Sequence, residues 1–145
     1  NRFAESDAAE TALSVMSFGF ARGIPRNADL MFDMRFLRNP HWIPELKPLT
    51  GRDSAVADYI ANDPAYAEAV RRIEELLLLL LPRYANEGKA YVTIAFGCTG
   101  GQHRSVHICE CIGERLRAAG FSPMVTHRDL GRSSGDATPE KKYQS

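Results

Sequence analysis

Short apolar runs at four places in the chain predict β-strands, namely residues 13–18, 30–36, 90–96 and 121–127. The run at 90–96 lies between Gly88 and Gly97 and is β-branched and aromatic, which is typical of a buried strand in a parallel sheet. In the run at 30–36, Asp33 and Arg35 are two positions apart. Because a strand repeats every two residues, we expect these two side chains to share a face.

Apolar side chains at helical spacing predict three helices, at residues 54–60, 64–87 and 106–116. Asp63 and Pro64 form an N-cap and a first helical residue for the longest one, which ends near Gly88. This helix carries six consecutive leucines. We interpret them as core packing, with an oligomer or membrane surface as the alternative.

Residues 37–53 form a long segment without either period, rich in proline and containing His41 and Trp42. A structureless segment of this length in a small domain is usually a functional loop or a linker, and its aromatic residues favour a folded functional loop.

The order of these elements predicts an α/β fold, a small and mostly parallel sheet flanked by helices, with ligands bound beyond the carboxyl ends of the strands. We expect one domain over residues 13–131. Residues 1–12 are expected to be a linker or the end of an upstream domain, and the Gly/Ser-rich residues 132–145 a disordered tail.

Composition narrows the class of protein. The 145 residues carry 18 basic and 18 acidic side chains, so no overall charge favours nucleic acid or an anionic membrane. The three cysteines form no disulfide framework, and no apolar run approaches the ~20 residues of a membrane span. We expect a soluble cytoplasmic protein. The chain starts without methionine, which suggests a piece of a longer protein.

The most informative stretch is residues 97–105, GCTGGQHRS, which leaves the third predicted strand and opens the last helix. A glycine-rich turn before a helix N-terminus presents backbone N–H groups to an anion. The hydroxyls of Thr99 and Ser105 and the guanidinium of Arg104 add further donors. The stretch predicts a phosphate-binding loop with Thr99, Gly100 and Gly101 at its centre.

Two other kinds of chemistry fit the same residues. Cys98, five residues, then Arg104 and Ser105 is the spacing of cysteine-dependent phosphatases, in which Cys98 would be the nucleophile and Arg104 would hold the phosphoryl group. Those enzymes usually carry histidine where Gly97 stands, and the acid would have to come from Asp29, Asp33 or Asp129. His103 and His107 are four apart and are a weak zinc signal, so we expect no metal and no cofactor.

Several blocks of the sequence resemble the RapZ family, also called RNase adapters. The similar blocks are SFGF, GIP and AD in residues 17–29, FDMRFL with NPHW in 32–42, PLTG in 48–51, GCTGG with HRSV in 97–106, and HRDL in 127–130. The resemblance runs from about residue 13 to 130 and concerns the C-terminal domain only. Because no Walker motif occurs here, ATP or GTP binding would belong to an N-terminal P-loop domain of the whole protein.

The resemblance implies a regulatory domain that binds an amino-sugar phosphate, such as glucosamine 6-phosphate, and couples cell-wall precursor supply to RNA decay. It implies small regulatory RNA, an RNase or regulatory protein, and further copies of the chain as partners. The ligand would meet His41, Cys98, Thr99, Gly100, Gly101, His103, Arg104 and Ser105. We expect a facing wall drawn from Ser17, Gly19, Asp33, Arg35, Asn39, Thr50, His127 and Arg128.

Family members carry a basic tail that helps to hold RNA. Here the tail contains only Arg132, Lys141 and Lys142, offset by Asp136 and Glu140. Clustered Lys and Arg supply most of the non-specific affinity for RNA, so a tail with few net cations argues against RNA binding as the main role. The main hypothesis is therefore a non-catalytic metabolite sensor. A cysteine phosphatase and a plain RNA-binding module are the competing hypotheses.

Overall fold

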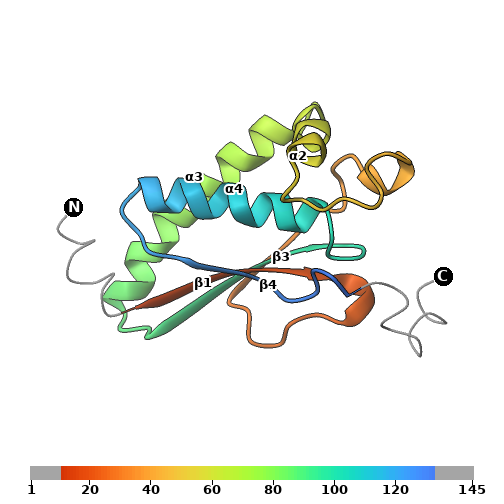
Figure 1. Cartoon of the computed structure of the whole chain (residues 1–145). Coiled ribbons are helices and arrows are strands. Elements are labelled where there is room, and N and C mark those ends of the chain that lie inside the picture. Colours follow the sequence, from red (N-terminus) through yellow and green to blue (C-terminus); the bar gives the residue numbers. More distant parts are fainter. Residues whose placement is uncertain (1–10, 133–145) are drawn as a thin grey trace.

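The computed structural model describes residues 11–132, and Figure 1 shows their arrangement. Four parallel strands form one sheet in the order β2-β3-β1-β4. The strands are β1 (Ala12–Gly19), β2 (Leu30–Asp33), β3 (Tyr91–Cys98) and β4 (Met124–His127). The α/β fold class and the parallel sheet predicted from the sequence are confirmed. The expected linker lies mostly, and the expected tail almost entirely, outside the described residues.

Three α-helices connect the strands: α2 (Ser54–Ala61), α3 (Tyr66–Asn86) and α4 (Arg104–Ala118). In Figure 1, α3 and α4 lie together on one face of the sheet. The core lies between these two layers. Leu13 and Val15 of β1 and Ile94 of β3 are buried there with Leu77 of α3 and Ile112 of α4. No helix among the described residues is long and apolar enough to cross a bilayer.

The leucine run of α3 is divided between two environments. Leu77 and Leu81 are buried in the core, whereas Leu76, Leu78 and Leu79 are exposed. This is the pattern of an amphipathic helix that packs one stripe against a sheet.

The predicted strand at 30–36 is wrong at its end, because β2 stops at Asp33. The carboxylate of Asp33 accepts a hydrogen bond from the backbone N–H of Arg35 at 3.0 Å, which turns the chain out of the strand. Asp33 and Arg35 therefore meet across a turn and not on one strand face. Their side chains form an ion pair with an N–O distance of 2.7 Å.

The start of the long helix also differs from the prediction. It begins at Tyr66, two residues after Pro64, because Asp63 caps a preceding turn. One Asp63 oxygen accepts from the N–H of Ala65 at 2.8 Å and the other accepts from the N–H of Arg38 at 2.8 Å. Asp63 thereby ties the long loop after β2 to the start of α3.

Candidate functional site

A pocket of about 500 Å³ opens at the edge of the sheet where the parallel strands end. This edge is where ligands bind in open α/β sheets. The pocket is lined by residues that follow all four strands: Ala21, Arg22, Asn39, His41, Trp42, Cys98, Thr99, Gly100, Gln102, His103, Arg104 and Arg132. None of these described lining residues is an aspartate or a glutamate. The pocket therefore favours an anion.

The loop between β3 and α4, residues 99–103, forms the floor of this pocket and is pressed against β1. A Cβ on Gly19 would lie 2.5 Å from the carbonyl carbon of Gly100, so only glycine permits this approach. Gly101 has a φ of 77°, which favours glycine. Within the described chain, the N–H groups of Gly100 and Gln102 donate no hydrogen bond to another residue. Both residues line the pocket.

Arg104, the first residue of α4, lies almost wholly buried beside this loop, with 4% of its surface exposed. Its Nη1 donates to the carbonyl oxygens of Arg35 at 2.7 Å and Leu37 at 3.1 Å, and its Nη2 donates to the Thr99 hydroxyl at 3.3 Å. Its Nε is buried and has no partner among the described residues. Burial lowers the pKa of Arg104 from its high ordinary value. A buried guanidinium with an unsatisfied donor calls for an acceptor.

Cys98 and Ser105 form a buried pair where β3 ends and α4 begins. The Cys98 thiol donates to the Ser105 hydroxyl, with an Sγ–Oγ distance of 3.1 Å, and its sulfur accepts from the Ser105 N–H at 3.3 Å. Cys98 lines the pocket but is only 2% exposed, and Ser105 is fully buried. Of this pair, Cys98 alone reaches the cavity, while Ser105 holds the loop from beneath.

Two histidines line the pocket where the long loop after β2 meets the loop before α4: His41 on the first and His103 on the second. His103 places its Nε2 3.2 Å from the carbonyl oxygen of Lys47, and burial lowers its pKa. His41 packs edge-on against Trp42, whose side chain is 73% exposed. The side chain of Asn39 accepts the N–H of His41 at 3.0 Å, which fixes the short 3₁₀ turn Pro40–Trp42. This wall offers an aromatic surface beside the cationic floor.

Of the expected ligand residues, His41, Cys98, Thr99, Gly100, His103 and Arg104 line the pocket, whereas Gly101 and Ser105 do not. Of the expected facing wall, only Asn39 lines it. The others are engaged elsewhere. Ser17 places its hydroxyl 2.8 Å from Nδ1 of His127, and Thr50 donates to Asp53. His103 and His107 have separate partners, since His107 Nε2 lies 2.8 Å from the Tyr66 hydroxyl.

Comparison with known proteins places this sequence in a family. The sequence-family model described as the RapZ C-terminal domain matches residues 11–131, nearly all of the described chain. The chain belongs to the RapZ C-terminal domain family. The resemblance seen in the sequence is thereby confirmed.

Two relatives of this RapZ-type domain are both named nucleotide-binding proteins. A nucleotide-binding protein of Rhizorhabdus wittichii is 66% identical over 136 residues, which are 94% of this chain and 44% of the relative. A nucleotide-binding protein of Sphingopyxis alaskensis is 59% identical over 97% of this chain and 44% of its own length. The chain thus spans less than half the length of these relatives.

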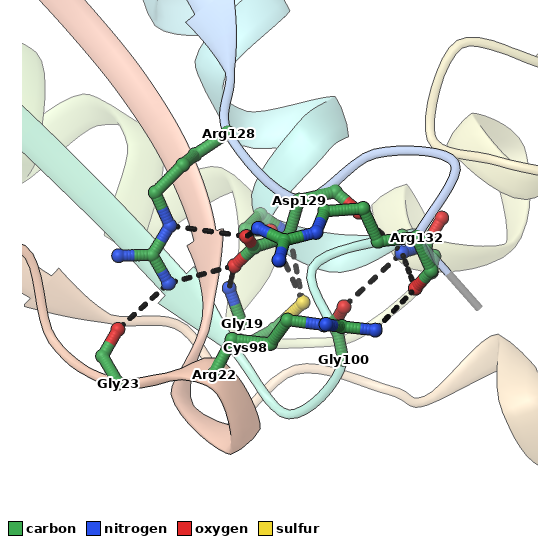
Figure 2. Close-up of polar contacts among 10 residues, drawn as sticks. Gly19, Arg22, Gly23, Cys98, Gly100, Arg128, Asp129 and Arg132 are labelled. Atoms are coloured by element: carbon green, nitrogen blue, oxygen red, sulfur yellow. Dashed lines mark hydrogen bonds and ion pairs between the residues drawn. The ribbon is translucent and has the colours of Figure 1, made fainter. Parts of the chain in front are cut away.

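The RapZ-type domain also has a hydrogen-bonded hub around Asp129, which the sequence suggested only as a candidate phosphatase acid; it includes Gly19 and Arg128 of the expected facing wall. Figure 2 shows Asp129 between Arg128 and Arg132. Asp129 is fully buried; its Oδ2 accepts from the Gly19 N–H at 2.8 Å and from Arg128 at 2.8 Å, and its Oδ1 accepts from Arg132 at 3.1 Å. The turn after β4 is thereby fastened to the end of β1.

Gln102 connects the same hub to the loop. Its Nε2 donates to the Asp129 carbonyl at 2.8 Å and to the Gly100 carbonyl at 3.2 Å, and its Oε1 accepts from the Gly131 N–H at 3.1 Å. Gln102 stands inside the glycine-rich stretch 97–105, and that position was the available sequence signal for its place in the site. The pocket positions of Arg22 and Arg132 had no such signal, because neither lies in that stretch.

Proposed function

We propose that this domain is a non-catalytic sensor whose pocket binds a phosphorylated metabolite, with an amino-sugar phosphate as the class that the family favours. The observation that carries the proposal is Arg104. It is a buried cation whose Nε is unpartnered among the described residues, and it lines a pocket that holds several donors and no carboxylate. A phosphoryl group in the pocket would place negative charge beside this buried guanidinium.

The phosphoryl group would lie on the floor of the pocket. Backbone N–H groups of Gly100 and Gln102, the Thr99 hydroxyl and Arg104 together supply neutral and charged donors from one short segment. The N-terminus of α4 adds a favourable dipole at the same place. The sugar would extend toward His41 and Trp42, whose rings offer an apolar surface and a hydrogen-bonding nitrogen.

A cysteine phosphatase is less well supported by this geometry, because none of the three candidate acids lines the pocket. The Arg35 guanidinium holds the pKa of Asp33 below its ordinary value, so this carboxyl is ionised at neutral pH. Asp129 is buried in its hub. Asp29 precedes β2, at the opposite end of that strand, where it pairs with Lys89 at 2.9 Å.

For the longer protein, we extend the proposal by family resemblance. The part of the relatives that this chain does not cover would bind ATP or GTP, in keeping with the name that those relatives carry. The domain described here would report the metabolite to small regulatory RNA and to an RNase or regulatory protein, within a cytoplasmic homo-oligomer. The three free cysteines fit a reducing compartment.

Titration calorimetry with glucosamine 6-phosphate tests the proposal. We expect binding that weakens at least tenfold in Arg104→Gln, because a charged hydrogen bond contributes about 1.5–3 kcal/mol. Since Arg104 also holds two backbone carbonyls, Thr99→Val is a second variant that leaves those bonds in place and should weaken binding less. Arg83→Gln is the matched control. Arg83 lies in the last turn of α3, just before the start of β3, and so at the edge of the sheet opposite the pocket.

Cys98→Ser separates the sensor from the phosphatase. The sensor predicts that this variant still binds and that the wild-type chain releases no phosphate from p-nitrophenyl phosphate. Turnover by the wild type that disappears in Cys98→Ser would establish the phosphatase instead. Absence of binding by any sugar phosphate would remove the sensor.

A further inference from the structure

The outward face of α3 carries apolar side chains that the described chain leaves exposed. Leu79 is 56% exposed and Leu76 is 38% exposed, whereas Leu77 and Leu81 on the inner face are buried in the core. Residues three positions apart are neighbours on a helix surface, so Leu76, Leu79 and Pro82 form one continuous apolar strip, here called the outer stripe. Contiguous exposed apolar side chains are typical of an interaction surface.

Charged side chains border the outer stripe on both sides along the helix. On the N-terminal side, Arg71 pairs with Glu68 at 2.6 Å and with Glu75 at 2.9 Å. On the C-terminal side stand Arg83 and Glu87, which are both exposed. Among the described residues, neither of these two side chains has a hydrogen-bonding or ion-pair partner. The C-terminal half of α3 therefore presents one cation and one anion that the chain itself does not match.

A second, antiparallel copy of α3 would cover the outer stripe with the same stripe. In a two-fold symmetric helix pair centred on Leu79, residues equally far before and after this position face each other. Leu79 then faces Leu79 of the second copy. Leu76 and Pro82, three positions to either side, face each other in the same way. The apolar contact is thus self-complementary.

The charges match in the same arrangement. Glu75 and Arg83 lie four positions before and after Leu79, so each Glu75 faces Arg83 of the second copy. Arg71 and Glu87 lie eight positions before and after it, and they also face each other with opposite charge. Opposite charges at the border of a helix pair fix the register and the orientation of the partner.

A pair centred on the other exposed leucine lacks this match. With the two-fold axis at Leu76, Arg83 would face Ala69 and Arg72 would face Leu80. Neither arginine would meet an acidic partner. The charge pattern therefore selects Leu79 as the centre.

The outer stripe lies away from the ligand pocket. Figure 1 shows the end of α3 beside the start of β3, whereas the pocket opens where the strands end. We therefore expect substitutions in the outer stripe, and at Arg83, to leave ligand binding unchanged.

We infer that the outer stripe is a two-fold dimer interface whose occupant is α3 of a second copy of this chain, with Glu75 of each copy paired to Arg83 of the other. The inference specifies a contact within the homo-oligomer of the proposed function and does not depend on the metabolite. Because one helix from each copy makes the contact, we expect a dimer that dissociates on dilution.

Sedimentation velocity on a dilution series of the full chain tests the interface. Glu75→Arg and Arg83→Glu each set like charges against each other twice in the dimer, so each should weaken dimerisation at least about tenfold. The double variant Glu75→Arg/Arg83→Glu restores opposite charges and should dimerise within about threefold of wild type. Arg26→Glu is the matched control, because it makes the same charge change at an exposed position outside α3.

Leu79→Glu is an independent variant that places two carboxylates at the axis, and we expect it to be monomeric. Thermal melting shows that each variant retains the fold. A wild type that stays monomeric, a dimer that survives Leu79→Glu, or a double variant as weak as the single ones would overturn the inference. Loss of glucosamine 6-phosphate binding by a chain that dimerises as described would overturn the proposed function and leave the interface standing.

Discussion

Two histidines packed into the protein are expected to make the stability of this domain depend on pH. His103 and His107 are both packed into the protein, and burial is the largest cause that lowers the pKa of each. Both are therefore expected to be neutral near pH 7. His103 Nε2 lies near the Lys47 carbonyl, and His107 Nε2 lies near the Tyr66 hydroxyl. For both rings, desolvation outweighs the neighbouring groups that favour the charged form.

This predicts a loss of stability in mild acid. An unfolded histidine takes up a proton near pH 6.5, whereas the folded one does so only at lower pH, so the unfolded state binds more protons as the pH falls. The free energy of unfolding should decrease between pH 7.5 and 5.5, by less than about 1.4 kcal/mol per pH unit for each histidine. Urea denaturation across this range measures it.

His107→Gln is the informative variant, because glutamine does not titrate and can still bond to the Tyr66 hydroxyl. The loss between the two pH values should be smaller in His107→Gln than in wild type. Contributions from carboxyl groups are common to both proteins and cancel. An identical loss in the two would show that His107 titrates alike in the folded and unfolded states.

At the scale of elements, the site depends on how closely the loop after β3 packs against the end of β1. Gly19→Ala places a methyl carbon about 2.5 Å from the carbonyl carbon of Gly100 and 2.8 Å from the nitrogen of Gly101. Because both contacts are to backbone, the loop must move. We expect a loss of about 1–3 kcal/mol in unfolding free energy and weaker ligand binding.

Gly100→Ala is the matched control for stability. A Cβ there meets nothing within 4 Å, and Gly100 has no positive φ. Its unfolding free energy should stay within about 0.5 kcal/mol of wild type in the same urea experiment. Equal stability of both variants would show that the loop is not held against β1 in the way described.

The elements themselves were largely readable from the sequence because their signals are local. Apolar periodicity placed every strand and α-helix in order, and the glycine-rich turn marked the edge of the sheet where the pocket lies. The end of β2 was not readable, since Asp33 prefers its own turn to a further strand residue. The hub around Asp129 joins segments 110 residues apart, and no period or short motif encodes such a contact.

At the scale of the whole molecule, the balance of charge limits what the domain binds unaided. Its 18 basic and 18 acidic side chains cancel, and three of its arginines, Arg22, Arg104 and Arg132, line one pocket. We expect this chain alone to bind single-stranded RNA weakly at 0.15 M salt, with little change in affinity between 0.05 and 0.2 M, because few phosphates would be neutralised. Fluorescence anisotropy with a labelled RNA measures both quantities. Tight, strongly salt-dependent binding that survives Arg104→Gln would favour the RNA-binding module.

The turn fastened by Asp129 has a practical consequence for experiments. Arg132 lines the pocket, whereas Ala12 begins β1 at the opposite edge of the sheet, where it pairs with Tyr91. A fluorophore attached at position 132 would thus sit within sensing distance of a bound metabolite, and an immobilising tag placed ahead of β1 would leave the pocket open. Positions 12 and 132 thus lie at opposite edges of one sheet, so attachment and readout need not interfere.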